Sequence, residues 1–159
     1  MFKKLLGIQL KTLGATDARH VSEVTEKLEV VCKAVADFLS SQRIWLVDSP
    51  QYKGGDSFLH DDRYFAFIFG CYDALMQISK FDQKEIFDYL PFLIMRLQDR
   101  QFMIGDARDI PVLRQKFGTL THYRLMIPHI QRGATSIQWA IGLRPDYVDT
   151  FALKETLGL

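Results

Sequence analysis

Hydrophobic residues recur at spacings of three and four near the start of the chain, which is the period of an amphipathic helix. The apolar positions are Val21, Val24, Leu28, Val31, Val35 and Phe38. The pattern predicts a helix that begins at Asp17 or Ser22 and reaches Gln42, and residues 43–47 either extend it or form a short extended piece. Residues 48–57 combine Pro, Gly, Asp and Ser, a composition typical of a loop.

A second helix is predicted from the His-Asp-Asp triplet at residues 60–62 to about Lys80. On a helical wheel, one narrow stripe is polar or small, and nearly every other position is large and apolar. The stripe consists of Asp62, Ala66, Gly70, Asp73, Gln77 and Lys80. Such a helix is buried on most sides. Ala66 and Gly70 leave room for another helix to approach closely, either within the chain or across a dimer.

The start of the third predicted helix has the strongest local signal, because Asp82 is a good N-cap and Glu85 completes a capping box. This helix is predicted to reach Gln101 with a kink at Pro91. Residues 104–111 are predicted to form the next loop.

Three further helices follow from the remaining pattern. Asp109 and Pro111 are predicted to open a fourth helix that Pro128 ends. A short helical segment over 134–142 and a last helix over 144–158 come after it. Alternating strand patterns and hairpin dipeptides are absent, so we predict an all-α single domain, residues 1–159, of five or six mostly antiparallel helices. Residues 1–16 are expected to form a loosely packed N-terminal segment.

Composition narrows the class of protein. With 48% hydrophobic and 13% aromatic residues the chain can build one continuous core, and a net charge of +1 makes nucleic acid an unlikely partner. Cys32 and Cys71 stand alone in apolar runs, as reduced core thiols of a cytoplasmic protein do. The longest apolar run, residues 64–72, is less than half of the about 20 residues that a bilayer span needs. We therefore expect no membrane segment.

The triplet at residues 60–62 offers the first candidate chemistry. A His-Asp pair at a helix start resembles part of the signature of HD-domain metal phosphohydrolases. The resemblance implies a divalent metal such as Mn or Mg held by His60, Asp61, His20 and either Asp106 or Asp109. The alternative interpretation, which we favour, is that an acidic residue of the triplet accepts free backbone N–H groups at a helix N-terminus.

A second candidate site lies at residues 131–136, Gln-Arg-Gly-Ala-Thr-Ser. If a helix begins here, Arg132, the flexible Gly133 and the hydroxyls of Thr135 and Ser136 are suited to hold a carboxylate or phosphate. The more common alternative is an ordinary Thr or Ser cap after a glycine turn.

No convergent set of acid, base or metal groups stands out, so the leading hypothesis is a non-catalytic helical-bundle protein without a cofactor. We expect it to bind a small apolar or anionic ligand or a protein partner, as a homodimer through apolar and aromatic helix faces. The twelve Phe, six Tyr and two Trp exceed the needs of one core, and the surplus would line a pocket or a subunit interface. The metal-dependent phosphohydrolase is the alternative.

Overall fold

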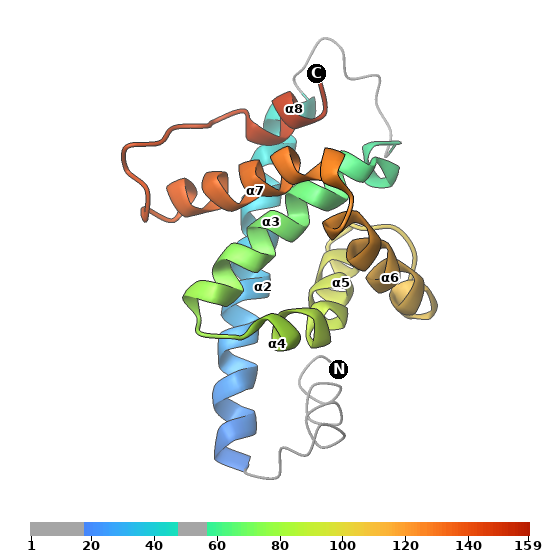
Figure 1. The fold of residues 1–159 in the computed structure, drawn as a ribbon, viewed down its shortest axis with the longest axis vertical. Helices are drawn as coiled ribbons and strands as arrows, with labels where there is room; N and C mark the ends of the chain where they lie inside the picture. The colour runs from blue at the N-terminus through green and yellow to red at the C-terminus, as the bar shows by residue number, and fades with distance from the viewer. Residues whose placement is uncertain (1–17, 48–56) are drawn as a thin grey trace.

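The long helix predicted first is present as α2, Ala18–Val47 (Figure 1). The computed structural model of the chain describes residues 18–47 and 57–159. The apolar stripe of α2 is buried from Val24 to Phe38, and the helix continues through residues 43–47, which settles the alternative left open there. The predictions for residues 1–16 and for the loop over 48–56 lie outside the described residues.

Helix α3, Asp62–Ile78, is the central helix of the fold. It follows a single 3-10 turn, η1, Ser57–His60. From residue 64 to residue 76 every residue except Asp73 is buried, and α2, α6, α7 and α8 all pack against it. The prediction of a helix buried on most sides is confirmed.

The tightest contact in the molecule joins α3 to α7, Ile127–Ala140, and the two helices lie side by side in Figure 1. Two glycines make the approach possible. A Cβ atom built on Gly70 would lie 1.9 Å from the carbonyl oxygen of Ile130, and one on Gly133 would lie 2.1 Å from that of Phe67. The close approach predicted at Gly70 is therefore confirmed, and the approaching helix belongs to the same chain.

The third predicted helix is divided into α4, Gln83–Asp88, and α5, Leu90–Asp99. The capping box is confirmed, since the Asp82 carboxylate accepts the backbone N–H of Glu85 and the Glu85 side chain accepts that of Asp82. The prediction of one helix kinked at Pro91 is wrong. Proline fits the first turn of a helix, where its missing N–H has no intrahelical partner to lose, so it opens α5 instead.

The preference of proline for the first turn of a helix also explains a second helix boundary that differs from the prediction. A 3-10 turn, η2, Ala107–Asp109, leads into α6, Ile110–Thr121, whose first turn contains Pro111 as predicted. The prediction that this helix continues to Pro128 is wrong: α6 ends at Thr121, the turn η3, Arg124–Met126, follows, and Pro128 lies in the first turn of α7.

The end of the chain is less helical than its sequence suggests. Residues 131–136 lie inside α7, so the helix start predicted there is wrong. The last helix, α8, comprises only Ala152–Thr156, and residues 143–151 run as an irregular segment between α7 and α8. Gly158 follows α8 with a φ of 73°, in agreement with its predicted role after the helix end.

The all-α class is confirmed for residues 18–47 and 57–159, which form helices and no strand. Within the same ranges, no helix combines the length and apolar character that a bilayer crossing requires.

Candidate ligand-binding site

A half-enclosed pocket with a volume of about 610 Å³ lies between α3, α4, the end of α6 and the first turns of α7. We call it the α3–α4–α7 pocket. Its volume falls within the range of about 300–1,000 Å³ that is typical of small-molecule sites. Each of these helices contributes to the wall, so the pocket exists only in the folded chain.

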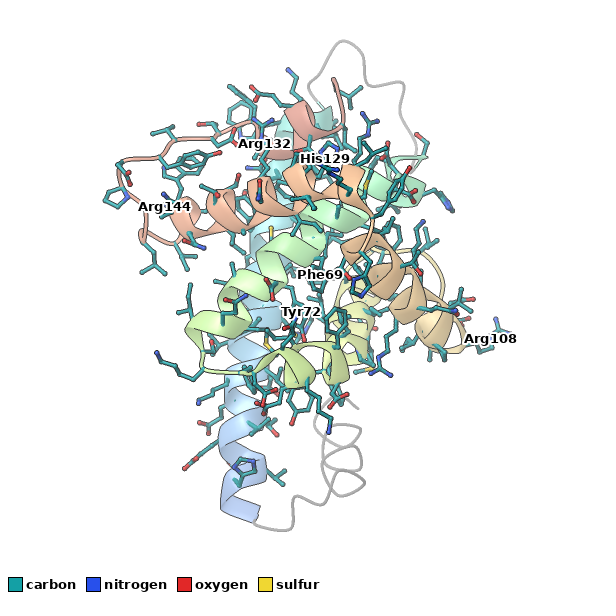
Figure 2. All side chains as sticks on the ribbon, viewed as in Figure 1. Phe69, Tyr72, Arg108, His129, Arg132 and Arg144 are labelled. Carbon is teal, nitrogen blue, oxygen red and sulfur yellow. The ribbon has the colours of Figure 1, made fainter. Side chains whose placement is uncertain are left out.

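The apolar wall of the pocket is rich in aromatic side chains. Phe69 from α3 and Phe87 from α4 lie with ring centroids 5.5 Å apart, and Phe81, in the turn between those helices, adds a third ring. Figure 2 shows Phe69 near the centre of the molecule, next to Tyr72 on the same helix. Ile86 and Ile130 complete this wall from α4 and α7.

The polar wall combines two residues of the stripe that the sequence shows on α3 with Gln83 of α4, Thr121 and His122 at the end of α6, and Gln131 of α7. Asp73 and Gln77, one helical turn apart, both line the pocket, and the Gln77 amide donates a hydrogen bond of 2.9 Å to the Asp73 carboxylate. Burial raises the pKa of Asp73, and the hydrogen bond from Gln77 opposes that rise without cancelling it. The exposed His122 faces the pocket from the end of α6.

Sequence reasoning identified the stripe on α3 but not the pocket. Gly70, in the middle of the stripe, packs against α7, whereas Asp73 and Gln77 line the open pocket. A signal was available, because Asp73 is a charged residue inside an otherwise apolar helix. Only the positions of α4, α6 and α7 decide that this part of the stripe remains uncovered.

The four residues predicted to bind an anion lie together in α7, and each of them contacts another part of the protein instead. Arg132 pairs with Asp149, Nε to Oδ2 at 2.9 Å, and also with Glu155. Gly133 is in contact with α3, and Ser136 donates a hydrogen bond of 3.2 Å to Asp149.

Thr135 donates to the backbone carbonyl of Gln131 at 2.9 Å, one turn earlier in α7. Because these residues lie in the interior of a helix, their backbone N–H groups are already used by the helix.

Asp149 is the centre of a polar group that we call the Asp149 cluster, formed by Arg132, Ser136, Tyr147, Asp149 and Glu155. Asp149 is only 8% exposed. Burial acts to raise its pKa, but hydrogen bonds from Arg132, Tyr147 and Ser136 outweigh that effect and hold the pKa below its usual value. The hydrogen bonds that Arg132 donates to Asp149 and Glu155 raise the pKa of the Arg132 guanidinium.

A buried glutamine attaches the same region to α2. The Gln42 amide donates to the carbonyl of Thr150 at 3.1 Å and accepts the backbone N–H of Leu153 at 3.0 Å. Together with the Asp149 cluster, it fastens the segment 143–151 to two helices. The arrangement satisfies its own polar groups, so we assign it a structural role.

The His-Asp-Asp triplet starts a helix, as the favoured interpretation holds. Asp61 is the N-cap of α3, where its carboxylate accepts the backbone N–H of Arg63 at 2.8 Å and pairs with the Arg63 guanidinium at 2.7 Å. The Arg63 contacts hold the pKa of Asp61 below its usual value, although burial acts in the opposite direction. His60 is exposed in η1.

The other proposed metal ligands lie elsewhere. His20 is in the first turn of α2, and in Figure 1 the start of α2 and η1 are at opposite ends of the molecule. Asp106 and Asp109 form a capping box with each other around η2. In the part of the chain that the structure describes, no group of three His, Cys, Asp or Glu side chains is placed to hold a metal ion.

The arginines of the second half of the chain are spread over the molecule. Figure 2 shows Arg108, Arg132 and Arg144 on three different sides. Arg108 pairs with Asp106 at 2.8 Å and Arg114 with Asp88 at 3.5 Å, so these arginines do not converge on one site.

No family model, no curated protein and no solved structure matches the chain. The argument on function therefore rests on the geometry described above.

Proposed function

We propose that this protein is a non-catalytic binding protein whose α3–α4–α7 pocket takes a small ligand with an apolar body. The observation that carries the proposal is a pocket of about 610 Å³ lined by three phenylalanines and three isoleucines on one side and by six polar side chains on the other. Concave pockets of this size with apolar walls and polar groups that orient the ligand are typical of small-molecule sites. Burial of such a ligand against Phe69, Phe81 and Phe87 would supply most of the binding free energy.

A titration with 2-phenylethanol, followed by NMR of backbone amides, tests the proposal. We expect saturable shifts confined to residues around the pocket. Gln83→Trp places a large side chain at the pocket wall and should weaken binding at least tenfold. Lys84→Trp is the matched control, because Lys84 is the adjacent exposed residue of α4 and is not part of the wall. Equal affinities for both variants, or shifts elsewhere in the protein, would contradict a ligand site here.

We also propose that the protein forms a homodimer, because large apolar side chains gather outside the core. Trp45 at the end of α2 is 40% exposed and Phe151 is 41% exposed, and their rings meet edge to face at 5.1 Å. Trp139 of α7 and Trp45 line the same hollow. Val148, in the segment 143–151 that follows α7, is 71% exposed. Exposed apolar surface of this kind is typical of interfaces.

Sedimentation velocity tests the dimer. We expect the unaltered protein to sediment as a dimer and Trp45→Glu to sediment as a monomer. Val30→Glu is the control, because Val30 is an exposed apolar residue of the same helix that does not line the hollow beside Trp45. Monomers at every protein concentration would remove this proposal without affecting the ligand pocket.

A cytoplasmic location is part of the same proposal. Cys32 and Cys71 are both buried as free thiols, and burial raises the pKa of Cys32 to about 12, which keeps its thiol protonated and unreactive. Fractionation of cells that produce the protein, with blotting of the soluble and membrane fractions, tests this point.

A further inference from the structure

We propose that the ligand of the α3–α4–α7 pocket is an organic cation, a protonated amine attached to an apolar body, and that Asp73 is its counter-ion. This inference rests on the proposed function and specifies the chemical class of the ligand. The apolar body would lie against the phenylalanine wall, and the ammonium group would face the carboxylate on α3.

The charges around the pocket favour a cation. Among the described residues that line the pocket, Asp73 is the one carboxylate, and none is a lysine or an arginine. A cationic head group placed beside Asp73 would be attracted to its carboxylate, and an anionic head group there would face repulsion.

Three nearby cations contact groups other than the Asp73 carboxylate. Arg114 pairs with Asp88 and donates to the backbone carbonyl of Phe87 at 3.2 Å. Lys116 pairs with Asp62 at 3.3 Å, in the first turn of α3 and away from Asp73. Lys27 of α2 lies 5.9 Å from the centroid of the Phe81 ring. None of the three is among the described residues that line the pocket, and a cationic ligand would supply the charge that complements Asp73 there.

Asp73 also has hydrogen-bonding capacity to spare. An ionised carboxylate offers about four acceptor positions. In the described residues the Gln77 amide is the side-chain donor that Asp73 receives, and burial of the carboxyl is not compensated by a cation. An ammonium group supplies up to three donors and a full positive charge, and the rings of the apolar wall favour a cation near their faces. A bound amine would reverse the effect that burial has on Asp73.

Three probes with the same phenyl body and different head groups test the inference on the full chain. They are phenethylamine, 2-phenylethanol and 3-phenylpropionate, titrated at about pH 7.5 with calorimetry and amide NMR. We expect phenethylamine to bind about tenfold more tightly than 2-phenylethanol, and 3-phenylpropionate to bind more weakly than both. Asp73→Asn keeps the shape of the side chain and removes its charge, so it should reduce the ratio of the affinities for the amine and the alcohol from about ten to about one.

The outcomes separate the two proposals. If the alcohol and the amine bind equally and Asp73→Asn changes neither, the cation inference is overturned and the pocket proposal stands. A preference for 3-phenylpropionate also overturns it and points to His122 as the polar partner. If none of the three probes shifts the pocket residues, the proposed function itself fails. Gln83→Trp should weaken binding of the amine at least tenfold, as it does for the alcohol.

Discussion

Two aspartates of this protein, the buried Asp149 and the half-buried Asp73, have opposite surroundings. Asp149 receives hydrogen bonds from Arg132, Ser136 and Tyr147, which hold its pKa below the usual value despite burial. Asp73 receives one hydrogen bond, from Gln77, and burial raises its pKa. The Asp149 carboxylate is thus compensated within the fold, whereas the Asp73 carboxylate is not.

The difference separates a structural carboxylate from a candidate for binding. A fold gains stability when a buried charge is paired and hydrogen-bonded, and it loses stability when the charge is left without a partner. The Asp149 cluster holds the segment 143–151 in place. Asp73 lines an open pocket and pairs with no cation among the described residues, so its carboxylate is suited to an external ligand.

The largest expected effect comes from the contact that positions both regions. Gly70→Leu places a side chain where the Ile130 backbone lies, so α7 has to move away from α3. We expect a loss of about 3 kcal/mol or more in the free energy of unfolding. Because α7 carries Arg132 as well as pocket residues, the Asp149 cluster and ligand binding should fail together.

Gly118→Ala is the control for this change, measured by chemical denaturation. No atom lies within 4 Å of a Cβ built on Gly118 in α6, so alanine should be neutral or should add up to about 1 kcal/mol. A stable Gly70→Leu variant would show that the helices do not approach as closely as described.

The next effect distinguishes the Asp149 cluster from surface ion pairs. Arg132→Met removes the cation that pairs with Asp149 and leaves a carboxylate that is only 8% exposed. We expect a loss of about 2 kcal/mol, as for hydrogen bonds to a charged group.

Arg108→Ala breaks the pair between Arg108 and Asp106, whose side chains are 89% and 55% exposed, and should leave the free energy of unfolding almost unchanged. Similar losses for Arg132→Met and Arg108→Ala in denaturant titrations would show that the Asp149 cluster contributes no more to the free energy of unfolding than a surface ion pair does.

The ionised carboxylate of Asp149 should stabilise the folded protein more at neutral pH than in acid. Its pKa is lower in the folded than in the unfolded protein, so its contribution is present above its ordinary pKa of 3.8 and is lost as the pH falls through the folded value. The unaltered protein should therefore exceed Asp149→Asn in stability most at about pH 7, and the gap should narrow in acid. Thermal melts of both proteins across this range provide the measurement. A gap that stays constant down to about pH 2 would show that the charge of Asp149 contributes nothing.

The smallest expected effect is the pH dependence of stability at Asp73, which should have the opposite sign to that at Asp149. Its pKa is raised in the folded protein, so the ionised carboxylate opposes folding once the pH rises above the ordinary value of 3.8 and through the raised one. Asp73→Asn should melt slightly above the unaltered protein at about pH 7.5 and equally below about pH 3. If the substitution lowers the melting temperature at neutral pH, Asp73 is a structural residue and the comparison with Asp149 fails.

Local signals in the sequence predicted the helix starts well where a side chain caps the backbone. The capping box at Asp82 and the N-cap at Asp61 both depend on residues within three positions of one another. Proline was the weak point. Pro91 and Pro128 open helices here instead of kinking or ending them, and which of the two occurs depends on where the next stretch of chain can pack.

The candidate site was less accessible to sequence reasoning. Arg132 and Ser136 were singled out correctly as neighbours, but their partner Asp149 is supplied by a segment beyond the end of α7. Asp73 was recognised as part of a polar stripe without any indication that it faces a pocket. Neither result follows from spacing along a helix, because both depend on which elements meet.

The sequence by itself determined the all-α class, the buried character of α3 and the close approach at Gly70, because helical periodicity, residue size and capping chemistry act over a few residues. Only the tertiary structure decided that α7 fills that approach, that Asp149 neutralises Arg132 and that Asp73 lines a pocket with three phenylalanine rings. These outcomes depend on contacts between segments far apart in the chain, and the free energy of such contacts is set by which groups remain buried and unpaired.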